Sequence, residues 1–558
     1  MSSTVDRVVV LGLDGATWTV LDPMIERGVM PNLGALRDGS ARGTLRSVVP
    51  PVTTAAWTSM MTGCLPPRHG VFDHRYYDAV EGRMKVNHSG RIRVPTLWRI
   101  LSEAGRTVVC LNLPGQYPPP SVRGVVVSGM DAPHLEGALQ GSQEFAQRLR
   151  AEVPGYALRY FWKRAPQSLD ELETNARQTA ESFRGRAEGG LLADRVYPDW
   201  SVLMVQFQNL DPFQHRVWPY LNVDDTGIER PGWNEAAALV MRGLDTAVGL
   251  LCELAERRGA AVVVVSDHGF GPCRGRIDVH RILLDSGLIR LPSWTGRLWR
   301  RGEQARDRLR VWRAKRSDPT ARSSSFDQAI VAQFPFDWKR TLAFAPHQDT
   351  AAMVYVNSSA RGGPHRNTAV STPRQLDEAR ELAFRALAQA RHPETGTPLF
   401  PLIIPVAEHY GLDPAREGYP DLIALPDEAY WVRTRFTPRG SVVSADPNLP
   451  GTHRLEGVIA LRGLGLAAGC RIQARLIDVA PTLLELLGLP VPSFIEGTSI
   501  LSGGATQESG QPHPRQHRVS TVHSRQDRCD GPHGPAFEIP PEEQAIIERR
   551  LAELGYLE

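Results

Sequence analysis

The fold is indicated by ten consecutive residues, Val262-Val263-Val264-Val265-Ser266-Asp267-His268-Gly269-Phe270-Gly271. Four valines in a row are typical of a strand buried on both faces, as in a parallel sheet covered by helices. The polar residues then follow where that strand would end, and this is the edge at which open α/β sheets bind ligands. A carboxylate beside an imidazole is a ligand pair that suits Zn or Mn. A strand ending in a turn with a surface histidine is the simpler interpretation of this stretch alone.

Apolar strands and helices alternate on both sides of this stretch. Strands are expected at residues 8–13, 107–113, 201–207 and 457–461, and helices at residues 23–38, 95–105, 168–192, 234–258 and 476–487. This alternation predicts an α/β fold with a mostly parallel, doubly wound sheet between helical layers.

Residues of the types that bind metals adjoin the other expected strands as well. Asp14 comes directly after residues 8–13, Asp211 and His215 follow residues 201–207, and His453 precedes residues 457–461. On a turn or a first helical turn, the spacing of Asp211 and His215 lets both side chains reach one metal. Each signal is weak alone, because such residues are common in loops. Together they supply oxygen and imidazole ligands for two metals at one edge of one sheet.

A hydroxyl group is expected beside these ligands. Pro50 and Pro51 end a strand, and residues 55–61 are expected to form a helix that is capped by a threonine and ends at Gly63. A hydroxyl at a helix N-terminus faces free N–H groups and the positive end of the helix dipole, which favours an anion. A plain helix cap without chemistry is the alternative from the local sequence.

The rest of the chain contains an insertion and a tail. Residues 326–440, with short strands at 352–356 and 421–425 and a helix at 373–390, predict a smaller α+β subdomain inserted into a core of residues 1–325 and 441–501. Residues 502–540 are rich in Gly, Pro, Ser and His, which predicts a disordered linker before a short helix within residues 541–558. Residues 297–316 are basic and amphipathic; a solvated helix over the core is favoured over contact with an anionic substrate or membrane surface.

The composition narrows the class of protein. The chain of 558 residues has 42% hydrophobic residues and a net charge of +3, which suits a soluble protein and gives no argument for a nucleic-acid partner. Its six cysteines lack CxxC spacing and predict a reducing compartment instead of a disulfide scaffold. We see no signal peptide and no apolar run of the roughly 20 residues that a membrane span needs. A cytoplasmic protein is therefore expected, and its oligomeric state is not indicated.

The motifs, taken in order, resemble those of the alkaline phosphatase superfamily, in particular its type I phosphodiesterase/nucleotide pyrophosphatase family. The matching motifs are Leu13-Asp14-Gly15, Pro51-Val52-Thr53 with Thr62-Gly63, Pro66-Pro67-Arg68-His69-Gly70, residues 211–215, Ser266-Asp267-His268-Gly269 and Gly451-Thr452-His453. As an ordered set they are highly specific, and the likeness extends from residue 8 to residue 501. The resemblance implies an alkaline-phosphatase-like fold.

The resemblance also implies a role for each site residue. One divalent cation would be held by Asp14, Thr53, Asp267 and His268. The other would be held by Asp211, His215 and His453. Thr53 would be the nucleophile that forms a phospho-threonine intermediate, with Thr54 as its local competitor. These ligand types favour zinc, with manganese as the second choice.

Two details depart from the pattern. Cys64-Leu65-Pro66-Pro67-Arg68 matches the C-x-P-x-R motif of the related sulfatases, but it follows Thr62-Gly63 instead of preceding it, and we interpret the match as coincidence. Ala56 stands three residues after Thr53, where many nucleotide pyrophosphatases have an Asn that helps to stabilise phosphate oxygens. Backbone N–H groups near Thr53 and the metals would then take a larger share of this role.

The sequence thus predicts a metal-dependent phosphoric ester hydrolase of the phosphodiesterase/nucleotide pyrophosphatase type, acting on a small-molecule phosphate ester. A phosphomonoesterase, or a phosphotransferase or mutase on the same fold, is the alternative, and analysis of the products would separate them. A non-catalytic binding relative is disfavoured, because such a protein has no reason to keep a nucleophile and six further ligands.

Overall fold

The computed structural model describes residues 4–79, 81–158, 161–292, 334–346, 350–362, 368–433, 440–502 and 539–554. Within these residues the centre is a nine-stranded sheet in the order β20-β2-β19-β9-β1-β8-β5-β6-β7. Its strands are β1 (Val8–Leu13), β2 (Ala41–Arg46), β5 (Thr107–Leu113), β6 (Gly124–Ser128), β7 (Leu139–Gln140), β8 (Trp200–Phe207), β9 (Ala261–Val265), β19 (Glu456–Arg462) and β20 (Arg471–Arg475). The strands from β9 to β6 run parallel, which confirms the expected mostly parallel sheet.

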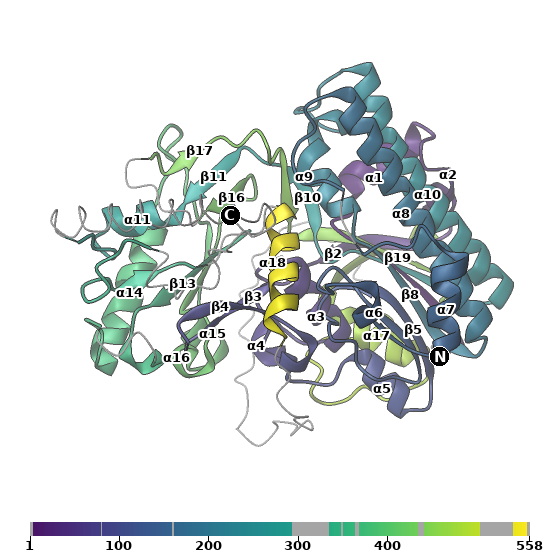
Figure 1. The fold of residues 1–558 in the computed structure, drawn as a ribbon, viewed down its shortest axis with the longest axis horizontal. Coiled ribbons are helices and arrows are strands. Elements are labelled where there is room, and N and C mark those ends of the chain that lie inside the picture. Colours follow the sequence, from purple (N-terminus) through teal and green to yellow (C-terminus); the bar gives the residue numbers. More distant parts are fainter. Residues whose placement is uncertain are drawn as a thin grey trace, which may run out of the picture.

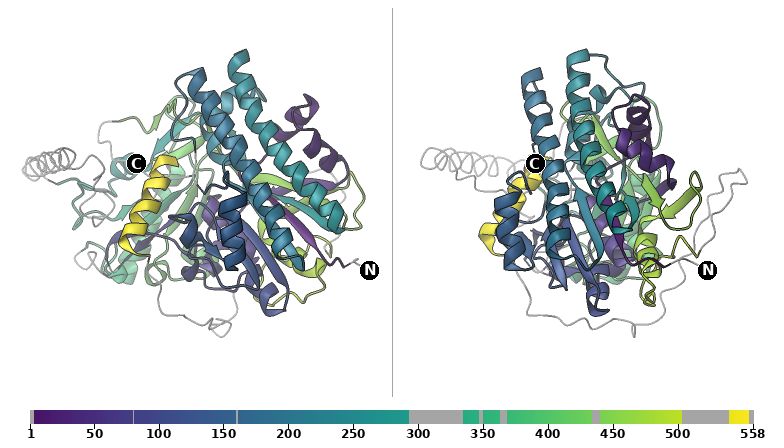
Figure 2. Two further views of the ribbon diagram at one scale, coloured as in Figure 1. Left: turned by 45° about the vertical axis from the view of Figure 1, so that its right-hand side comes forward. Right: turned by 90° about the vertical axis from the view of Figure 1, so that its right-hand side faces the viewer.

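Strand β1 shows why this sheet is covered on both faces. Val9 and Leu11 belong to one hydrophobic cluster, whereas Val8 and Val10 belong to another, as the alternation of side chains along a strand requires. The first face is covered by α8 (Leu169–Val196) and α10 (Pro231–Arg258), and the second by α3 (Thr53–Thr62), α5 (Leu97–Glu103) and α17 (Val479–Leu486). The long helices α8 and α10 lie side by side against the sheet (Figures 1 and 2).

The core differs from the sequence prediction in several places. The helix expected at residues 23–38 is two helices, α1 (Trp18–Glu26) and α2 (Pro31–Asp38), because Gly28 takes a φ of 72° between them and Pro31 begins the second. Strands β2, β6, β7 and β20 have no counterpart in the prediction. The mixed polar and apolar residues of β2 and β20 are only partly buried at one side of the sheet.

A second, smaller sheet lies beside the core (Figure 1). Its strands are antiparallel, in the order β12 (Ala343–Phe344), β13 (Ala352–Val356), β15 (Leu422–Leu425) and β14 (Leu402–Pro405). Helices α14 (Pro373–Gln389) and α11 (Val279–Asp285) contribute to the same hydrophobic cluster. So does the hairpin of β3 (Arg75–Asp78) and β4 (Arg83–Val86), which therefore joins the chain after α3 to the smaller sheet.

Shorter elements complete the described chain. Strand β10 (Gly269–Pro272) pairs with β18 (Gly451–Arg454), and β11 (Gly275–Asp278) lies between β16 (Tyr430–Arg433) and β17 (Val443–Ser444). The remaining helices include α4 (Pro66–His69), α6 (Leu135–Ala138), α7 (Gln143–Glu152), α9 (Leu210–Leu221), α15 (Val406–Tyr410), α16 (Pro414–Glu417) and α18 (Pro541–Leu554).

The expected terminal helix forms and docks on the core. Ile547 and Leu551 of α18 are buried in the first hydrophobic cluster, and Nη2 of Arg550 donates to the backbone oxygen of Pro133 at 2.6 Å. The basic segment 297–316 and almost all of the expected linker 502–540 lie outside the described residues.

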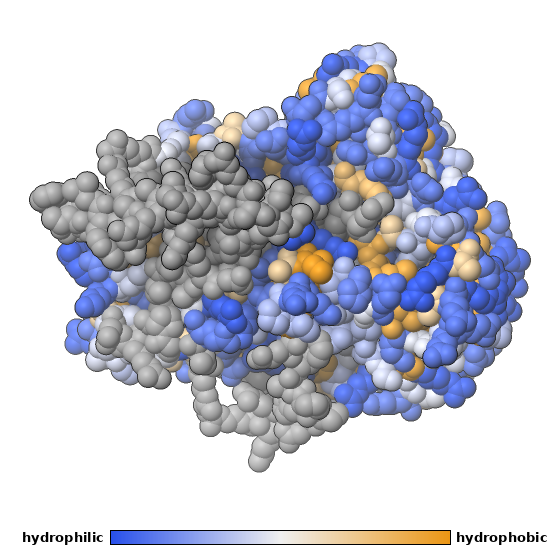
Figure 3. All heavy atoms as spheres, in the orientation of Figure 1, coloured by the Kyte–Doolittle hydropathy of each residue, from blue (hydrophilic) through white to orange (hydrophobic). Residues whose placement is uncertain are grey.

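The described surface is mainly polar on the face seen in Figure 3, where hydrophobic side chains gather only in small separate groups. Among the described residues, none of the helices has the length and apolar character needed to span a membrane. The cytoplasmic location stays a prediction.

Candidate metal centre

Three neighbouring parallel strands deliver polar side chains to one edge of the central sheet. Asp14 follows β1 directly, and Asp267 and His268 come just after β9. Helix α9, which follows β8, carries Asp211 and His215 on successive turns. Because β1 lies between β8 and β9, all these residues emerge side by side.

Two further residues reach this edge from other segments. His453 lies on β18, opposite Phe270 of β10. Thr53 is the first residue of α3, whose N-cap residue is Val52. The expected threonine cap is therefore wrong, because the helix begins earlier than predicted and no side chain caps it. The expected end of the helix is confirmed, since Gly63 takes the left-handed conformation there with a φ of 65°.

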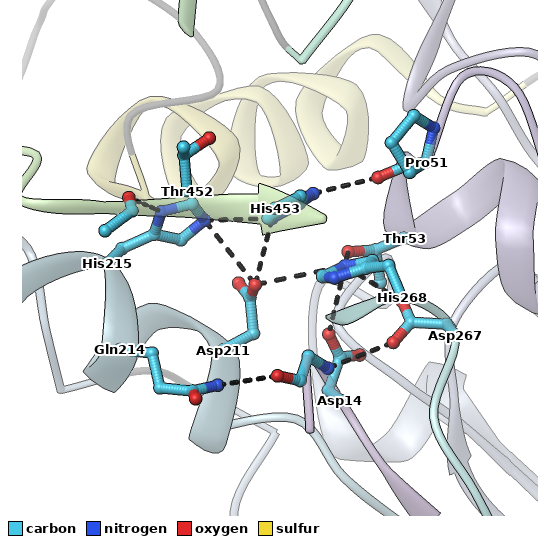
Figure 4. Close-up of polar contacts among 12 residues, drawn as sticks. Asp14, Pro51, Thr53, Asp211, Gln214, His215, Asp267, His268, Thr452 and His453 are labelled. Carbon is cyan, nitrogen blue, oxygen red and sulfur yellow. Dashed lines mark hydrogen bonds and ion pairs between the residues drawn. The ribbon is translucent and has the colours of Figure 1, made fainter. Parts of the chain in front are cut away.

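The acidic residues and histidines form two adjoining clusters of buried side chains (Figure 4). The members are Asp14, Asp267 and His268 in the first cluster, and Asp211, His215 and His453 in the second. Within each cluster the candidate ligand atoms lie within 4.8 Å of one another. His268 Nε2 is 3.2 Å from Asp267 Oδ2 and 4.0 Å from Asp211 Oδ1, so the two clusters touch. Every site residue named from the sequence is brought to this place.

Backbone carbonyl groups orient the three imidazole rings. Each Nδ1 lies 2.8 to 3.0 Å from a backbone oxygen, in the pairs His215 with Gly451, His268 with Gly269, and His453 with Pro51. A carbonyl oxygen only accepts hydrogen bonds, so we assign the ring proton to each Nδ1. Each Nε2 then presents a lone pair to the carboxylates, which is the arrangement of a metal-ligating histidine.

These lone pairs are too close to one another to be stable alone. The Nε2 atoms of His215 and His453 are 3.0 Å apart, and His453 Nε2 is also 3.0 Å from Asp211 Oδ1. With the protons on Nδ1, three electron-pair donors meet with no hydrogen between them. Among the described residues, the buried atoms Asp14 Oδ1 and Asp267 Oδ2 also accept no hydrogen bond. Carboxylate oxygens and imidazole nitrogens in this arrangement fit divalent cations.

The electrostatics of the clusters support the same interpretation. Burial raises the pKa of the Asp14 carboxyl well above its usual value, and the nearby carboxylates of Asp267 and Asp211 raise it further. Burial likewise raises the pKa of Asp267. Burial lowers the pKa of His215 to about 3, which keeps the ring neutral and able to bind a metal. Divalent cations would supply the positive charge that these buried carboxylates lack.

The two threonines at the start of α3 point to different partners. Thr53 Oγ1 is 3.4 Å from His268 Nε2 and so faces the clusters, as Figure 4 shows. Thr54 Oγ1 instead contacts His74 Nδ1 at 2.5 Å. His74 was not predicted from the sequence, where it stands four residues after the Pro66-Pro67-Arg68-His69-Gly70 motif. The only sequence signal for it is its position close behind that motif.

Residues beneath the first cluster hold Asp14 in place and were also missed. Trp57 Nε1 and Gln206 Nε2 both donate to Asp14 Oδ2, at 2.9 and 2.6 Å. Arg186 Nη1 donates to the backbone oxygen of Gln206 at 2.8 Å. Gln206 could have been found from its pattern, because it is an amide within the buried strand β8. Trp57 shows no such signal, since an apolar helix position accounts for it equally well.

Cys64 and Ala56 have no part in this centre. The Cys64 thiol donates to the backbone oxygen of Phe494 at 3.3 Å, and burial raises its pKa to about 12. A thiol in this state is a poor nucleophile, which agrees with a coincidental match to the sulfatase motif. Ala56 is fully buried in the second hydrophobic cluster.

The chain was compared with curated proteins and with solved structures. A search of curated proteins finds no match. Among solved structures, phosphonoacetate hydrolase from Sinorhizobium meliloti 1021, in complex with phosphonoformate, is 17% identical with a TM-score of 0.51; the match covers 88% of this chain and 98% of that one. Murine ectonucleotide pyrophosphatase/phosphodiesterase 5 is 14% identical with a TM-score of 0.48; the match covers 87% of this chain and 96% of that one. At these identities the first likeness shows a shared fold.

Most of the chain matches the model of one protein family. The model of the family described as "Type I phosphodiesterase / nucleotide pyrophosphatase" matches residues 8–454. That span is more than half of the chain and includes both clusters and Thr53. The chain therefore belongs to the type I phosphodiesterase/nucleotide pyrophosphatase family of phosphoryl-ester hydrolases.

Proposed function

We propose that the protein hydrolyses phosphoric diesters with Thr53 as the nucleophile and a phospho-threonine as the intermediate. The observation that carries the proposal is the position of Thr53 Oγ1, which is 3.4 Å from His268 Nε2 at the edge of the two clusters. Thr54 is a weaker candidate because its hydroxyl is engaged by His74.

Two divalent cations would be held at this edge, zinc by preference and manganese as the second choice. Thr53 and the first cluster would hold one, and the second cluster would hold the other. When bound, such a pair lowers the pKa of a hydroxyl and stabilises the attacking and leaving oxygens of an in-line displacement.

The residues of the chain would act in two steps. Thr53 Oγ loses its proton and bonds to phosphorus, while one alcohol leaves with a proton. Water then cleaves the new Thr53–phosphate bond and releases a phosphomonoester. During both steps the backbone N–H groups at the start of α3, which have no side-chain cap, would face the phosphate oxygens. These N–H groups would provide more of the stabilisation of the phosphate oxygens, because the Ala56 side chain has no polar atom that could bind them.

The intermediate gives a direct test. Acid quenching during turnover of a 4-nitrophenyl alkyl phosphodiester, followed by peptide mass spectrometry, should find the phosphoryl group with its retained alkyl ester on Thr53. The same alkyl phosphate on Thr54 only, or turnover that survives Thr53→Ala, would contradict the proposal. Phosphotransferase activity is checked in the same reaction by adding an alcohol, because a transferase would pass the phosphoryl group to that alcohol in preference to water. Matched mono- and diesters test the monoesterase alternative.

A further inference from the structure

Two aromatic side chains, Phe270 and Trp431, lie directly against the histidines of the second cluster and are called the aromatic wall below. Trp431 meets the His215 ring at a centroid distance of 5.4 Å and an interplanar angle of 84°. It meets the His453 ring at 5.8 Å, also at 84°. Phe270 meets the His215 ring at 4.7 Å and 72°. Edge-to-face contacts of this kind are preferred between aromatic rings and stabilise their mutual orientation.

Strand β16 brings Trp431 to this place from outside the central sheet. Trp431 is buried in the first hydrophobic cluster, whereas Val432 is buried in the cluster of the smaller sheet. This division follows from the alternation of side chains along a strand. Strand β16 also pairs in parallel with β11, where Trp431 lies opposite Arg276. The position of Trp431 is therefore set by strand pairing and by packing on two hydrophobic clusters.

Phe270 is held between the two elements that carry the histidines. It lies on β10 opposite His453 of β18, and the two ring centroids are 5.5 Å apart. It also stacks on Trp218 of α9, at a centroid distance of 5.8 Å and an interplanar angle of 25°. Trp218 Nε1 in turn donates to Asp224 Oδ2 at 2.9 Å. Phe270 thus has a fixed place beside the second cluster.

Hydrogen bonds alone do not fix the direction of the two imidazole rings. The Nδ1 atoms of His215 and His453 contact the backbone oxygens of Gly451 and Pro51. One hydrogen bond fixes one atom of a ring, and the ring can still tilt about that atom. Both Nε2 atoms are nevertheless turned toward Asp211 Oδ1, that of His453 at 3.0 Å and that of His215 at 3.5 Å. The aromatic wall limits the tilt, because a rotated ring would collide with it in a closely packed interior.

We propose that the aromatic wall holds His215 and His453 in the orientation that lets them bind a divalent cation together with Asp211. Phe270 and Trp431 are then positioning residues, since they act through the histidines and have no lone pair to offer to a cation. Groups that orient metal ligands change metal affinity by about 10- to 100-fold. The inference rests on the proposed two-metal site, and it adds which residues outside the ligand set control the affinity for one of the two cations.

Metal titration tests the proposal. Metal-free protein would be titrated with zinc in competition with a chromophoric chelator, which gives one affinity for each bound cation. The affinity that disappears in His453→Ala belongs to the second cluster. In Trp431→Leu, which stays apolar but lacks a flat ring, this affinity should fall by about 10- to 100-fold while the other stays unchanged. Trp431→Phe keeps a flat ring and should lose less.

A matched control separates positioning from packing. Trp98 is also fully buried, but it belongs to the second hydrophobic cluster, on the other face of the central sheet. Trp98→Leu should lower the thermal stability, as the loss of a large core side chain does, and leave both zinc affinities unchanged. Phe270→Leu removes less volume than Trp431→Leu and should weaken the same zinc site. This variant decides the question if Trp431→Leu does not fold.

Cobalt supplies a readout that a change in stability alone does not move. Bound Co²⁺ absorbs visible light with an intensity and a band shape that depend on the geometry of its ligands. If the histidine rings tilt, the spectrum of cobalt at the second cluster should change in Trp431→Leu. The spectrum should stay the same in Trp98→Leu.

The titrations also show when the proposal fails. Wild-type zinc affinity at the second cluster in Trp431→Leu would overturn it, as would the same result in Phe270→Leu if the first variant does not fold. An equal loss of zinc affinity in Trp98→Leu would also overturn it, because general destabilisation would then account for the effect. None of these measurements involves turnover, so the hydrolase proposal is tested separately, by the modification of Thr53.

Discussion

His453→Ala tests the second cluster most directly. His453 Nε2 lies 3.0 Å from both Asp211 Oδ1 and His215 Nε2, so the substitution removes one of three protein ligands at that point. The first cluster loses only the ring of His453 that stacks on His268 at a centroid distance of 3.6 Å. One cation should therefore be lost and the other retained.

The size of the effect follows from linkage. Changes that only reorient a metal ligand cost about 10- to 100-fold in affinity, so the loss of a ligand should cost at least about 100-fold. At a free metal concentration about 100 times the wild-type Kd, metal binding adds about 2.7 kcal/mol to the free energy of unfolding. With a Kd raised about 100-fold, the same concentration adds only about 0.4 kcal/mol. The variant should therefore lose about 2 kcal/mol of metal-dependent stability.

The assay combines metal analysis with thermal unfolding, each with and without added zinc. Metal-free samples of both proteins give the reference, because the lost hydrogen bond to Pro51 and the lost ring stacking change stability whether or not a metal is bound. The exposed His409 on α15 provides a control, His409→Ala. Wild-type metal content in His453→Ala, together with an undiminished gain in stability from zinc, would refute the assignment.

Four other substitutions test the nucleophile, the support of Asp14 and a buried carboxyl group. Thr53→Ala should reduce kcat by at least about 1,000-fold because the nucleophile is lost, whereas Thr54→Ala should cost far less, and the reverse order in steady-state assays would contradict the choice of Thr53. Gln206→Met removes a donor to Asp14 and should weaken metal binding by about 10- to 100-fold in titrations; unchanged affinity would show that this hydrogen bond is dispensable. Burial raises the pKa of Asp131 to about 6, so its folded form binds a proton more readily than its unfolded form, and its contribution to stability is lost as the pH rises from about 4 to about 6. In Asp131→Asn this part of the fall in Tm should disappear, and an identical pH profile would contradict the shift.

The parts of the fold that could be predicted are those with a strong local pattern. The valine run of β9 reads as a strand buried on both faces, and it is one. Asp211 and His215 have a spacing that brings them together on any helix, as α9 does. The half-exposed strands β2 and β20 lack such a pattern, because tertiary pairing with β19 and with each other accounts for them.

The candidate metal ligands could be predicted from the sequence. The groups that orient these ligands could not. Carboxylates and imidazoles after strand ends are visible in the sequence because their chemistry is specific. Pro51 orients His453 through its backbone oxygen, and the direction of a carbonyl group cannot be predicted from the residue type. Contacts between the chain after β4 and α16 were also not predictable, because they join residues more than 300 positions apart, such as Arg93 and Glu417.

The carbonyl groups that orient the histidines have a consequence for how this site tolerates mutation. The main chain at Gly269 and Gly451 fixes two of the three rings, so no side-chain change there removes the hydrogen bond as such. Yet a Cβ at Gly269 would lie 1.9 Å from the backbone oxygen of Glu456, and one at Gly451 would lie 2.5 Å from that of Gln214. Any replacement must displace the carbonyl and swing the ring away from its cluster. In a genetic screen these glycines would behave as essential positions, even though neither offers an atom to the chemistry.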